Sequence, residues 1–194
     1  MRRLVEALCS DECAGRAPGT PGGARARAMV LDALRDEGLD PYAQEIARCR
    51  GANVLAEIRG DIDRWVMIAA HYDHLGVEGG RVYRGADDNA AAVGRRLEVA
   101  RRLAAEPPER RGVELPAFDA EEPPYFLTPA MGSEHFARHP TVPLERIDLM
   151  VCMDLVGHAL GGEGLPAEVR DTVFALGAER SPGTRDVLLD TREP

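Results

Sequence analysis

The chain has 194 residues, of which 44% are hydrophobic, and its 33 acidic residues outnumber its 24 basic residues. This length and composition predict one globular domain over residues 1–194 and exclude a disordered chain or a fibre. The net charge of -9, with no basic run longer than a pair, argues against nucleic acid as a partner. Every basic residue is arginine, so lysine chemistry such as Schiff-base formation is excluded.

The sequence also bears on localisation and on the cysteines. No apolar stretch reaches the length of a membrane-spanning helix, and Glu6 interrupts the first apolar run too early for a signal peptide. We therefore expect no membrane partner and a cytoplasmic protein, or an exported one if residues precede this sequence.

The four cysteines lack the spacing of a disulfide framework; they are Cys9, Cys13, Cys49 and Cys152. We interpret them as buried thiols, with a structural zinc ion as the less favoured alternative.

Helical and strand patterns alternate along the chain. In the first half of the chain they predict a helix over 2–9 with a polar cap at 10–12, a loop over 15–23, a helix over 24–37, and strands over 53–58 and 65–70. In the second half they predict a helix over 90–104, a strand over 113–120, a helix over 133–138 capped by Ser133, a strand over 147–153 and a helix over 166–176. Glu114 and Pro116 are poor residues for a central strand. The alternation predicts an α/β layered fold with functional groups at the carboxyl ends of strands.

Acidic and imidazole side chains follow three of the predicted strands. They are His71 and Asp73 after the first, Glu121 and Glu122 after the second, and Asp154 after the third, with Asp87 and Asp88 in the loop before helix 90–104. Carboxylates crowded at one edge of a sheet repel one another unless a cation neutralises them. Imidazole mixed with carboxylate favours zinc over calcium or magnesium, so the sequence predicts a zinc-type site.

Five ordered motifs strengthen this interpretation. They are HYDHLG at 71–76, YRGADDNA at 83–90, FDAEE at 118–122, GSEHF at 132–136 and MDLVG at 153–157. Together they resemble the two-zinc aminopeptidases, family 28 of the metallopeptidases, which include bacterial leucyl aminopeptidases and aminopeptidase Y and have glutaminyl cyclases as relatives. The resemblance implies a three-layer sandwich with a mixed, mostly parallel central sheet, incomplete at its C-terminal end. Residues 1–194 would then be the amino-terminal portion of a single catalytic domain.

The resemblance also implies metal ligands. His71 would bind the first zinc ion, Asp88 would bridge both ions, and Glu122 and Asp154 would bind the second. Each ligand has an alternative: His71 as a buried histidine satisfied by Asp73, residues 87–89 as a helix cap, residues 121–122 as solvated loop charge, and Asp154 as a strand-end cap.

Two further roles follow from the same resemblance. Glu121 would be the general base, and Asp73 would orient His71 through its second ring nitrogen. The remaining histidines before Asp154, His74, His135 and His139, are expected to be structural or on the surface.

The C-terminal end departs from the family pattern. The family supplies a second histidine to the first zinc, and His158 is the only histidine after Asp154, in the position of an ordinary loop residue. We therefore expect a zinc-dependent aminopeptidase that acts on peptides with a free N-terminus and carries two zinc ions, or one or none. The alternatives are a non-catalytic interaction module and a glutaminyl-cyclase-like enzyme. Residues 123–131 would form either a cleft wall or a surface loop.

Overall fold

The computed structural model describes residues 1–157, 164, 166, 175–177 and 183–184. The chain divides into two compact units, Met1–Gly157 and His158–Pro194. Every element described below belongs to the first unit. The predicted helix over residues 166–176 lies largely outside the described residues, and His158 lies entirely outside them.

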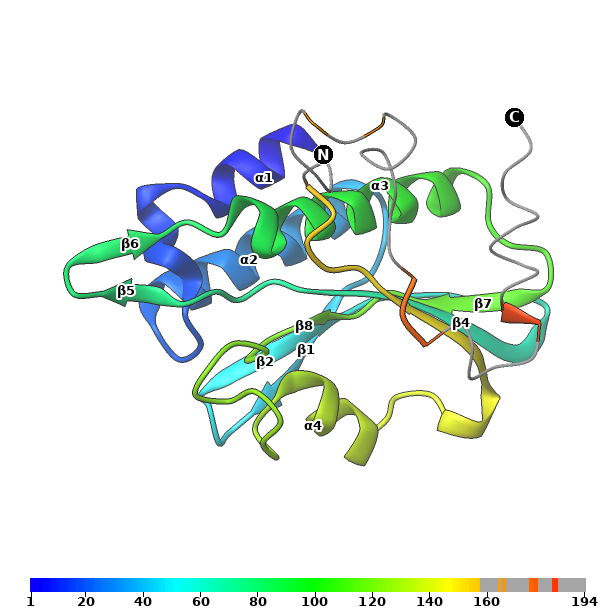
Figure 1. Ribbon diagram of the computed structural model, residues 1–194. Coiled ribbons are helices and arrows are strands. Elements are labelled where there is room, and N and C mark those ends of the chain that lie inside the picture. Colours follow the sequence, from blue (N-terminus) through cyan, green and yellow to red (C-terminus); the bar gives the residue numbers. More distant parts are fainter. Residues whose placement is uncertain (158–163, 165, 167–174, 178–182, 185–194) are drawn as a thin grey trace. The chain divides into compact units, whose positions relative to one another are not determined.

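A mixed β-sheet forms the centre of the first unit (Figure 1). Strand β4 pairs in parallel with β7, β8 and β9, whereas β1 pairs with β2, β2 with β8 and β3 with β7 in antiparallel fashion. The strands are β1 (Tyr42–Ile46), β2 (Gly51–Leu55), β3 (Glu57–Ile58), β4 (Ile62–His71), β7 (Arg111–Glu114), β8 (Ala117–Phe118) and β9 (Ile147–Cys152). The predicted α/β fold with a mixed sheet is therefore confirmed.

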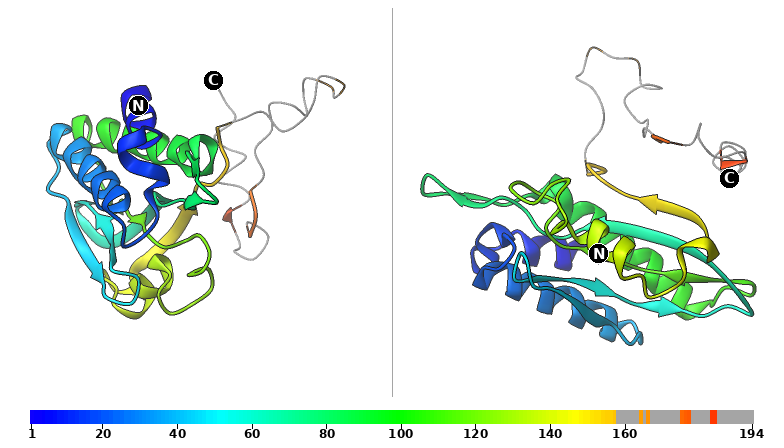
Figure 2. Two further views of the ribbon diagram at one scale, coloured as in Figure 1. Left: turned by 90° about the vertical axis from the view of Figure 1, so that its left-hand side faces the viewer. Right: turned by 90° about the horizontal axis from the view of Figure 1, so that it is seen from below.

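Helices cover both faces of this sheet (Figures 1 and 2). Helices α1 (Arg2–Leu8), α2 (Pro21–Asp36) and α3 (Ala92–Ala105) lie on one face, and α4 (Gly132–Arg138) lies on the other. The larger hydrophobic core lies between the first three helices and the sheet. In a smaller core the rings of Phe118 and Phe136 pack edge to face, with their centroids 6.0 Å apart. This is the three-layer arrangement that the resemblance implied, and burial of these apolar faces stabilises it.

Helix boundaries differ from the prediction where capping chemistry intervenes. Helix α2 begins at Pro21, three residues before the predicted start, because the Thr20 hydroxyl accepts the Gly23 N–H at 3.1 Å. Helix α3 begins later than predicted, because a separate helical turn, η2 (Ala86–Ala91), precedes it. Ser133 is not the cap of α4, since Met131 occupies that position.

Two predicted strands are each divided in two. Residues 53–58 lie in β2 and β3, with a break at Ala56, and residues 113–118 lie in β7 and β8, with a break at Leu115 and Pro116. The Leu115 N–H donates to the Ala56 carbonyl at 2.8 Å, so the two breaks lie opposite each other. Pro116 has no N–H to contribute to the ladder, which accounts for the interruption there. Residues 119–120, predicted as strand, are loop.

Several short elements were not predicted. They are β1, the hairpin of β5 (Gly76–Glu78) and β6 (Arg81–Tyr83), and the 3₁₀ turns η1 (Asp11–Arg16) and η3 (Leu144–Arg146). The four cysteines are free thiols, but only Cys13 and Cys49 are buried as predicted. Cys9 is half-buried, and Cys152 is exposed because β9 pairs only with β4 among the described strands.

No helix among the described residues is long and apolar enough to cross a membrane.

Candidate metal centre

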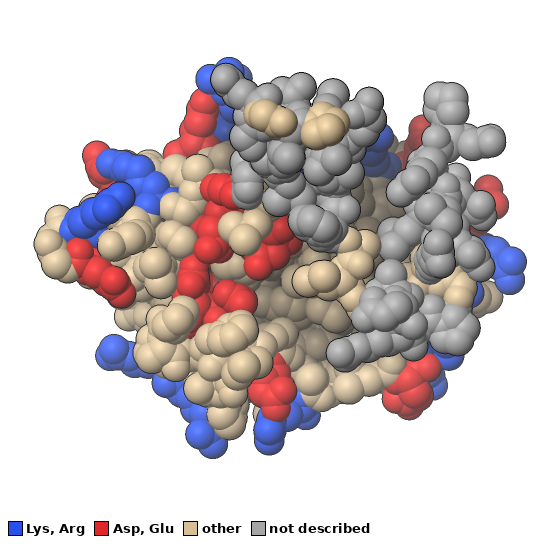
Figure 3. Space-filling view, viewed as in Figure 1, with Lys and Arg blue, Asp and Glu red and all other residues tan. Residues whose placement is uncertain are grey.

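The sheet topology places the predicted site residues at one edge. Strands β4, β8 and β9 are parallel neighbours, so their carboxyl ends lie together. The residues at or just after those ends are His71, Asp73 and His74 for β4, Glu121 and Glu122 for β8, and Asp154 for β9, while η2 brings Asp88. Figure 3 shows acidic side chains gathered on this face of the molecule.

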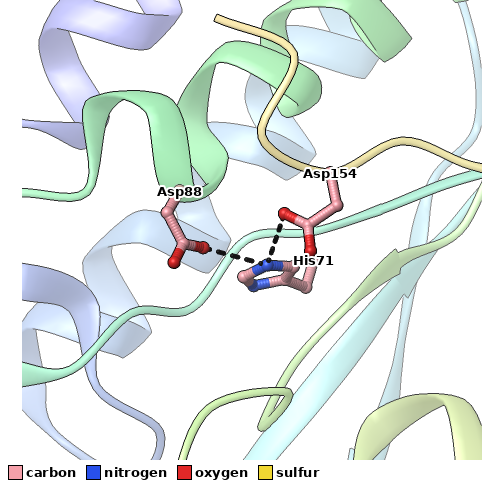
Figure 4. Close-up of side chains that lie close together, drawn as sticks. All are labelled: His71, Asp88 and Asp154. Atoms are coloured by element: carbon pink, nitrogen blue, oxygen red, sulfur yellow. Dashed lines mark ion pairs between the residues drawn. The ribbon is translucent and has the colours of Figure 1, made fainter. Parts of the chain in front are cut away.

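One group of ligand atoms surrounds the imidazole of His71. Its Nε2 atom lies 3.2 Å from Asp88 Oδ1 and 3.5 Å from Asp154 Oδ1, and Figure 4 shows both carboxylates directed at the ring. One ligand atom from each of the three residues lies within 4.8 Å of the others. Asp154 was expected to lie with Glu122, but the structure places it with His71, because β9 and β4 are adjacent and end side by side.

The His71 ring is buried among negative charges. Its side chain is 4% exposed, and neither ring nitrogen has a hydrogen-bond partner among the described residues. Burial alone would lower the pKa of His71, but the carboxylates of Asp154, Asp73 and Asp88 raise it to about 12. In turn His71 lowers the pKa of Asp88. These carboxylates therefore stabilise positive charge at this position, whether a proton or a metal cation supplies it.

Asp73 connects the two sides of the site. One of its carboxylate oxygens lies 3.5 Å from His71 Nδ1 and accepts the Glu121 N–H at 3.1 Å, and the other accepts the Glu122 N–H at 3.1 Å. The distance to Nδ1 is consistent with the orienting role expected for Asp73. The contacts with the two backbone amides were not expected, and they tie the turn after β8 to the end of β4.

A second group of ligand atoms lies around Glu122. His74 Nδ1 lies 2.6 Å from Glu122 Oε1 and 4.0 Å from Asp88 Oδ1, and the three residues again offer atoms within 4.8 Å of one another. Asp88 thus belongs to both groups. His74 was expected to be structural or on the surface, and its spacing of three residues from His71 is the one signal in the sequence that could have placed it in the site.

Glu121 lies beside the first group with its side chain partly exposed. Its Oε2 atom is 3.8 Å from His71 Nε2. Burial raises the pKa of Glu121, and the neighbouring charges of Asp73, Glu122 and Asp154 raise it further, while His71 opposes them. A partly exposed carboxylate with a raised pKa beside a group of potential metal ligands has the properties of a general base.

The structure also identifies supporting residues to which the sequence assigned no role. Asp119 accepts the Ala52 and Ala120 N–H groups at 2.9 Å and lies 2.8 Å from the Tyr72 hydroxyl. Burial, followed by the charge of Asp73, raises the pKa of Asp119 to about 6. This buried network fixes the backbone immediately before the two glutamates.

Arg16 supports the other side of the site. Its guanidinium group is fully buried and donates to five backbone carbonyls, two of which belong to Tyr72 and Asp88. The other carbonyls are those of Leu8, Arg84 and Gly85. Arg16 thereby joins the end of β4 to η2, although the sequence showed it only as one residue of a loop.

The donor set fits zinc. Two imidazoles and three carboxylates from separate segments converge, and the buried nitrogens of His71 have no other partner among the described residues. Gly85 and Ala91 occupy the N-cap positions of η2 and α3, so the alternative that residues 87–89 serve only as a helix cap is wrong. The fold and site together define a protein in which an α/β sheet presents carboxylates and imidazoles that could hold a metal ion.

Comparison with known proteins agrees with this class. A family model described as peptidase family M28 matches residues 53–171, which is more than half of the chain, so the chain belongs to peptidase family M28. The Escherichia coli protein YfbL is 36% identical over 121 residues, which cover 59% of this chain and 36% of YfbL.

Solved structures show the same fold. A Zn-dependent exopeptidase from Parabacteroides distasonis has a TM-score of 0.64 at 22% identity, covering 81% of this chain and 62% of that one. A glutaminyl cyclase from Porphyromonas gingivalis has a TM-score of 0.66 at 24% identity, covering 80% and 60%. The chain thus spans about a third of YfbL and about three fifths of these structures.

Proposed function

We propose that this protein is a zinc-dependent hydrolase of the aminopeptidase type, which cleaves the N-terminal residue from peptides. The observation that carries the proposal is the convergence of His71, Asp88 and Asp154 beside Glu121 at the carboxyl edge of the sheet. Family membership supports hydrolysis of a peptide bond, and the similarity to a Zn-dependent exopeptidase supports zinc.

His71, Asp88 and Asp154 would hold one zinc ion, and Asp88 and Glu122 would contribute to a second position. Zinc bound there would polarise the scissile carbonyl group and lower the pKa of a water molecule. Asp73 keeps the His71 ring in place and holds the amides of Glu121 and Glu122, so the ligand and the base keep a fixed separation.

Glu121 then moves the proton. Its carboxylate accepts a proton from the attacking water and returns it to the departing amine. The raised pKa of Glu121 suits this exchange, because a more basic carboxylate accepts the proton of the water molecule more readily. The surrounding carboxylates would also attract the positively charged α-amine of a substrate, which favours cleavage at a free N-terminus.

The substitution Glu121→Gln tests this role. It removes the base but keeps the size of the side chain, so we expect the zinc content to be unchanged and the turnover of aminoacyl anilides to fall by about 10²- to 10⁴-fold. Glu78→Gln, on the exposed hairpin, is the matched control and should retain full activity. Unchanged turnover by the Glu121 variant would remove Glu121 from the base role.

A glutaminyl cyclase activity is the second candidate, because cyclases have the same fold at equal similarity. Mass spectrometry of a peptide that begins with glutamine separates the two activities. Loss of ammonia would indicate cyclisation, whereas release of free glutamine would indicate aminopeptidase activity.

A further inference from the structure

His74 is a buried histidine whose position the catalytic scheme above does not explain. Its side chain is 9% exposed, and Nδ1 faces Glu122 Oε1 at 2.6 Å, with Asp88 Oδ1 beyond at 4.0 Å. Glu122 is itself only 11% exposed. An imidazole and two carboxylates from three segments of the chain therefore converge on one small volume next to the His71 group.

The local backbone allows this approach because residue 85 is a glycine. A Cβ atom on Gly85 would lie 2.5 Å from Cγ of His74 and would collide with the carbonyl oxygen of Asp88. Gly85 also has a left-handed conformation, with φ of 53°. The turn before η2 is thus shaped so that the His74 ring and the Asp88 segment pack against each other.

We infer that His74 is a metal ligand, and that His74, Glu122 and the shared Asp88 form the second cation site. This inference rests on the proposed function and adds a nitrogen ligand to the position that otherwise has only two carboxylates. Three protein ligands with a fourth position open to water or substrate are the usual arrangement of a catalytic zinc ion, and imidazole and carboxylate are both zinc ligands.

The spacing of the donor atoms supports this assignment. Donors about 2.0–2.2 Å from a tetrahedral zinc ion lie about 3.3–3.6 Å from one another. His74 Nδ1 lies 2.6 Å from Glu122 Oε1, which is below that range, and 4.0 Å from Asp88 Oδ1, which is above it. Shifts of these side chains by less than about 1 Å would bring both distances into the range. His71, buried and without a hydrogen-bond partner among the described residues, faces the same Asp88 from the other side.

The competing role is that of a positioning residue. In that case His74 would keep a proton on Nδ1 and donate it to Glu122, holding the carboxylate in place without contacting the cation. Both roles predict weaker metal binding after substitution, so the decisive measurement must detect the bond between His74 Nδ1 and the ion.

The full chain, labelled with ¹⁵N in its histidine rings, is titrated with ¹¹³Cd²⁺ and followed by NMR. We expect ¹¹³Cd–¹⁵N coupling at His71 and at His74 Nδ1, with two Cd²⁺ ions per chain by equilibrium dialysis. A His74 Nδ1 that keeps its proton and shows no coupling while His71 is coupled would overturn this inference and leave the proposed function intact. Absence of coupling at both rings would overturn both.

Substitution provides the second measurement. His74→Ala should bind one Cd²⁺ or Zn²⁺ ion per chain at concentrations that fill two sites in the unaltered protein, which corresponds to a loss of at least about 100-fold in affinity at the second site. His139→Ala, on the exposed end of α4, should still bind two ions. Two ions bound by the His74 variant, with affinities within tenfold of the unaltered protein, would contradict the ligand role.

Discussion

The guanidinium group of Arg16 is a buried charge whose described hydrogen-bond partners are all neutral. Its Nε atom donates to the Tyr72 carbonyl at 2.7 Å, and its other nitrogens donate to the carbonyls named above. Burial lowers the pKa of Arg16, although the group remains cationic at any physiological pH. The cost of burying this charge is offset by five backbone acceptors that otherwise would have to find other donors.

Arg16→Met tests the structural importance of this residue. Methionine fills a similar volume but leaves the carbonyls without their donor, and each unsatisfied buried acceptor costs about 1–3 kcal/mol. We expect the free energy of unfolding in urea to fall by about 3 kcal/mol or more. Arg2→Met on the exposed surface of α1 should leave the unfolding midpoint unchanged. A fall of less than about 1 kcal/mol would show that water or other groups replace the guanidinium.

The elements most faithfully predicted are those whose pattern is long and whose burial is complete. The apolar run 65–70 lies within β4, and the periodic residues 90–104 lie in η2 and α3. By contrast, β1, β5 and β6 are short and largely exposed, so their composition carries no signal of alternation. Proline has no N–H, so the sequence indicated that Pro116 is a poor strand residue. The alignment of this break with the break at Ala56 depends on pairing between distant segments, which the sequence does not show.

Glu114 in β7 is unusual, because a central strand rarely buries a carboxylate. The side chain is fully buried and accepts a hydrogen bond from Thr141 at 3.3 Å, and its second oxygen has no partner in the part of the chain that the structure describes. Burial, followed by the charge of Glu57, raises the pKa of Glu114 to about 8, and the hydrogen bond from Thr141 and the charge of Arg96 only partly oppose the shift. The folded protein therefore binds a proton at Glu114 that the unfolded chain has lost by neutral pH.

The sign of the resulting pH dependence is fixed by linkage. Between the ordinary pKa of 4.5 and the folded value of about 8, the folded state holds more protons at this site, so its contribution to stability falls as the pH rises. Glu114→Gln removes this dependence. We expect its free energy of unfolding to be close to that of the unaltered protein at pH 5 and higher by about 2 kcal/mol or more at pH 8.

Urea denaturation at the two pH values measures the effect of Glu114→Gln. Glu109→Gln, at an exposed position shortly before β7, should show the same pH dependence as the unaltered protein. A Glu114 variant that parallels the unaltered protein from pH 5 to pH 8 would show that Glu114 is ionised in the folded state.

For the molecule as a whole, the sequence could predict which residues lie at the edge of the sheet but not how they group there. Each site residue follows a strand or opens a helix, and those positions are visible as motifs. The pairing of Asp154 with His71 depends on β9 lying beside β4, which no local pattern encodes. His74 and Arg16 escaped prediction for the same reason, because their partners lie on distant segments.

The concentration of like charge at this edge also predicts how the stability of the protein responds to metal. Five carboxylates lie close to His71 or His74, and their mutual repulsion opposes folding unless positive charge is bound. A cation that binds only the folded state at 100 times its dissociation constant contributes about 2.7 kcal/mol. We therefore expect zinc to raise the melting temperature by about 5–10 °C and EDTA to reverse the rise.

The control for this prediction separates the site from the rest of the acidic surface. Asp88→Asn alters a residue that belongs to both ligand groups, so zinc should shift the melting temperature of this variant little, whereas Asp61→Asn, on an exposed loop, should respond like the unaltered protein. Magnesium at the same concentration should have a smaller effect, because it prefers shells of oxygen ligands to imidazole. An equal zinc response in the Asp88 and Asp61 variants would mean that the stabilising cation binds elsewhere on the acidic surface.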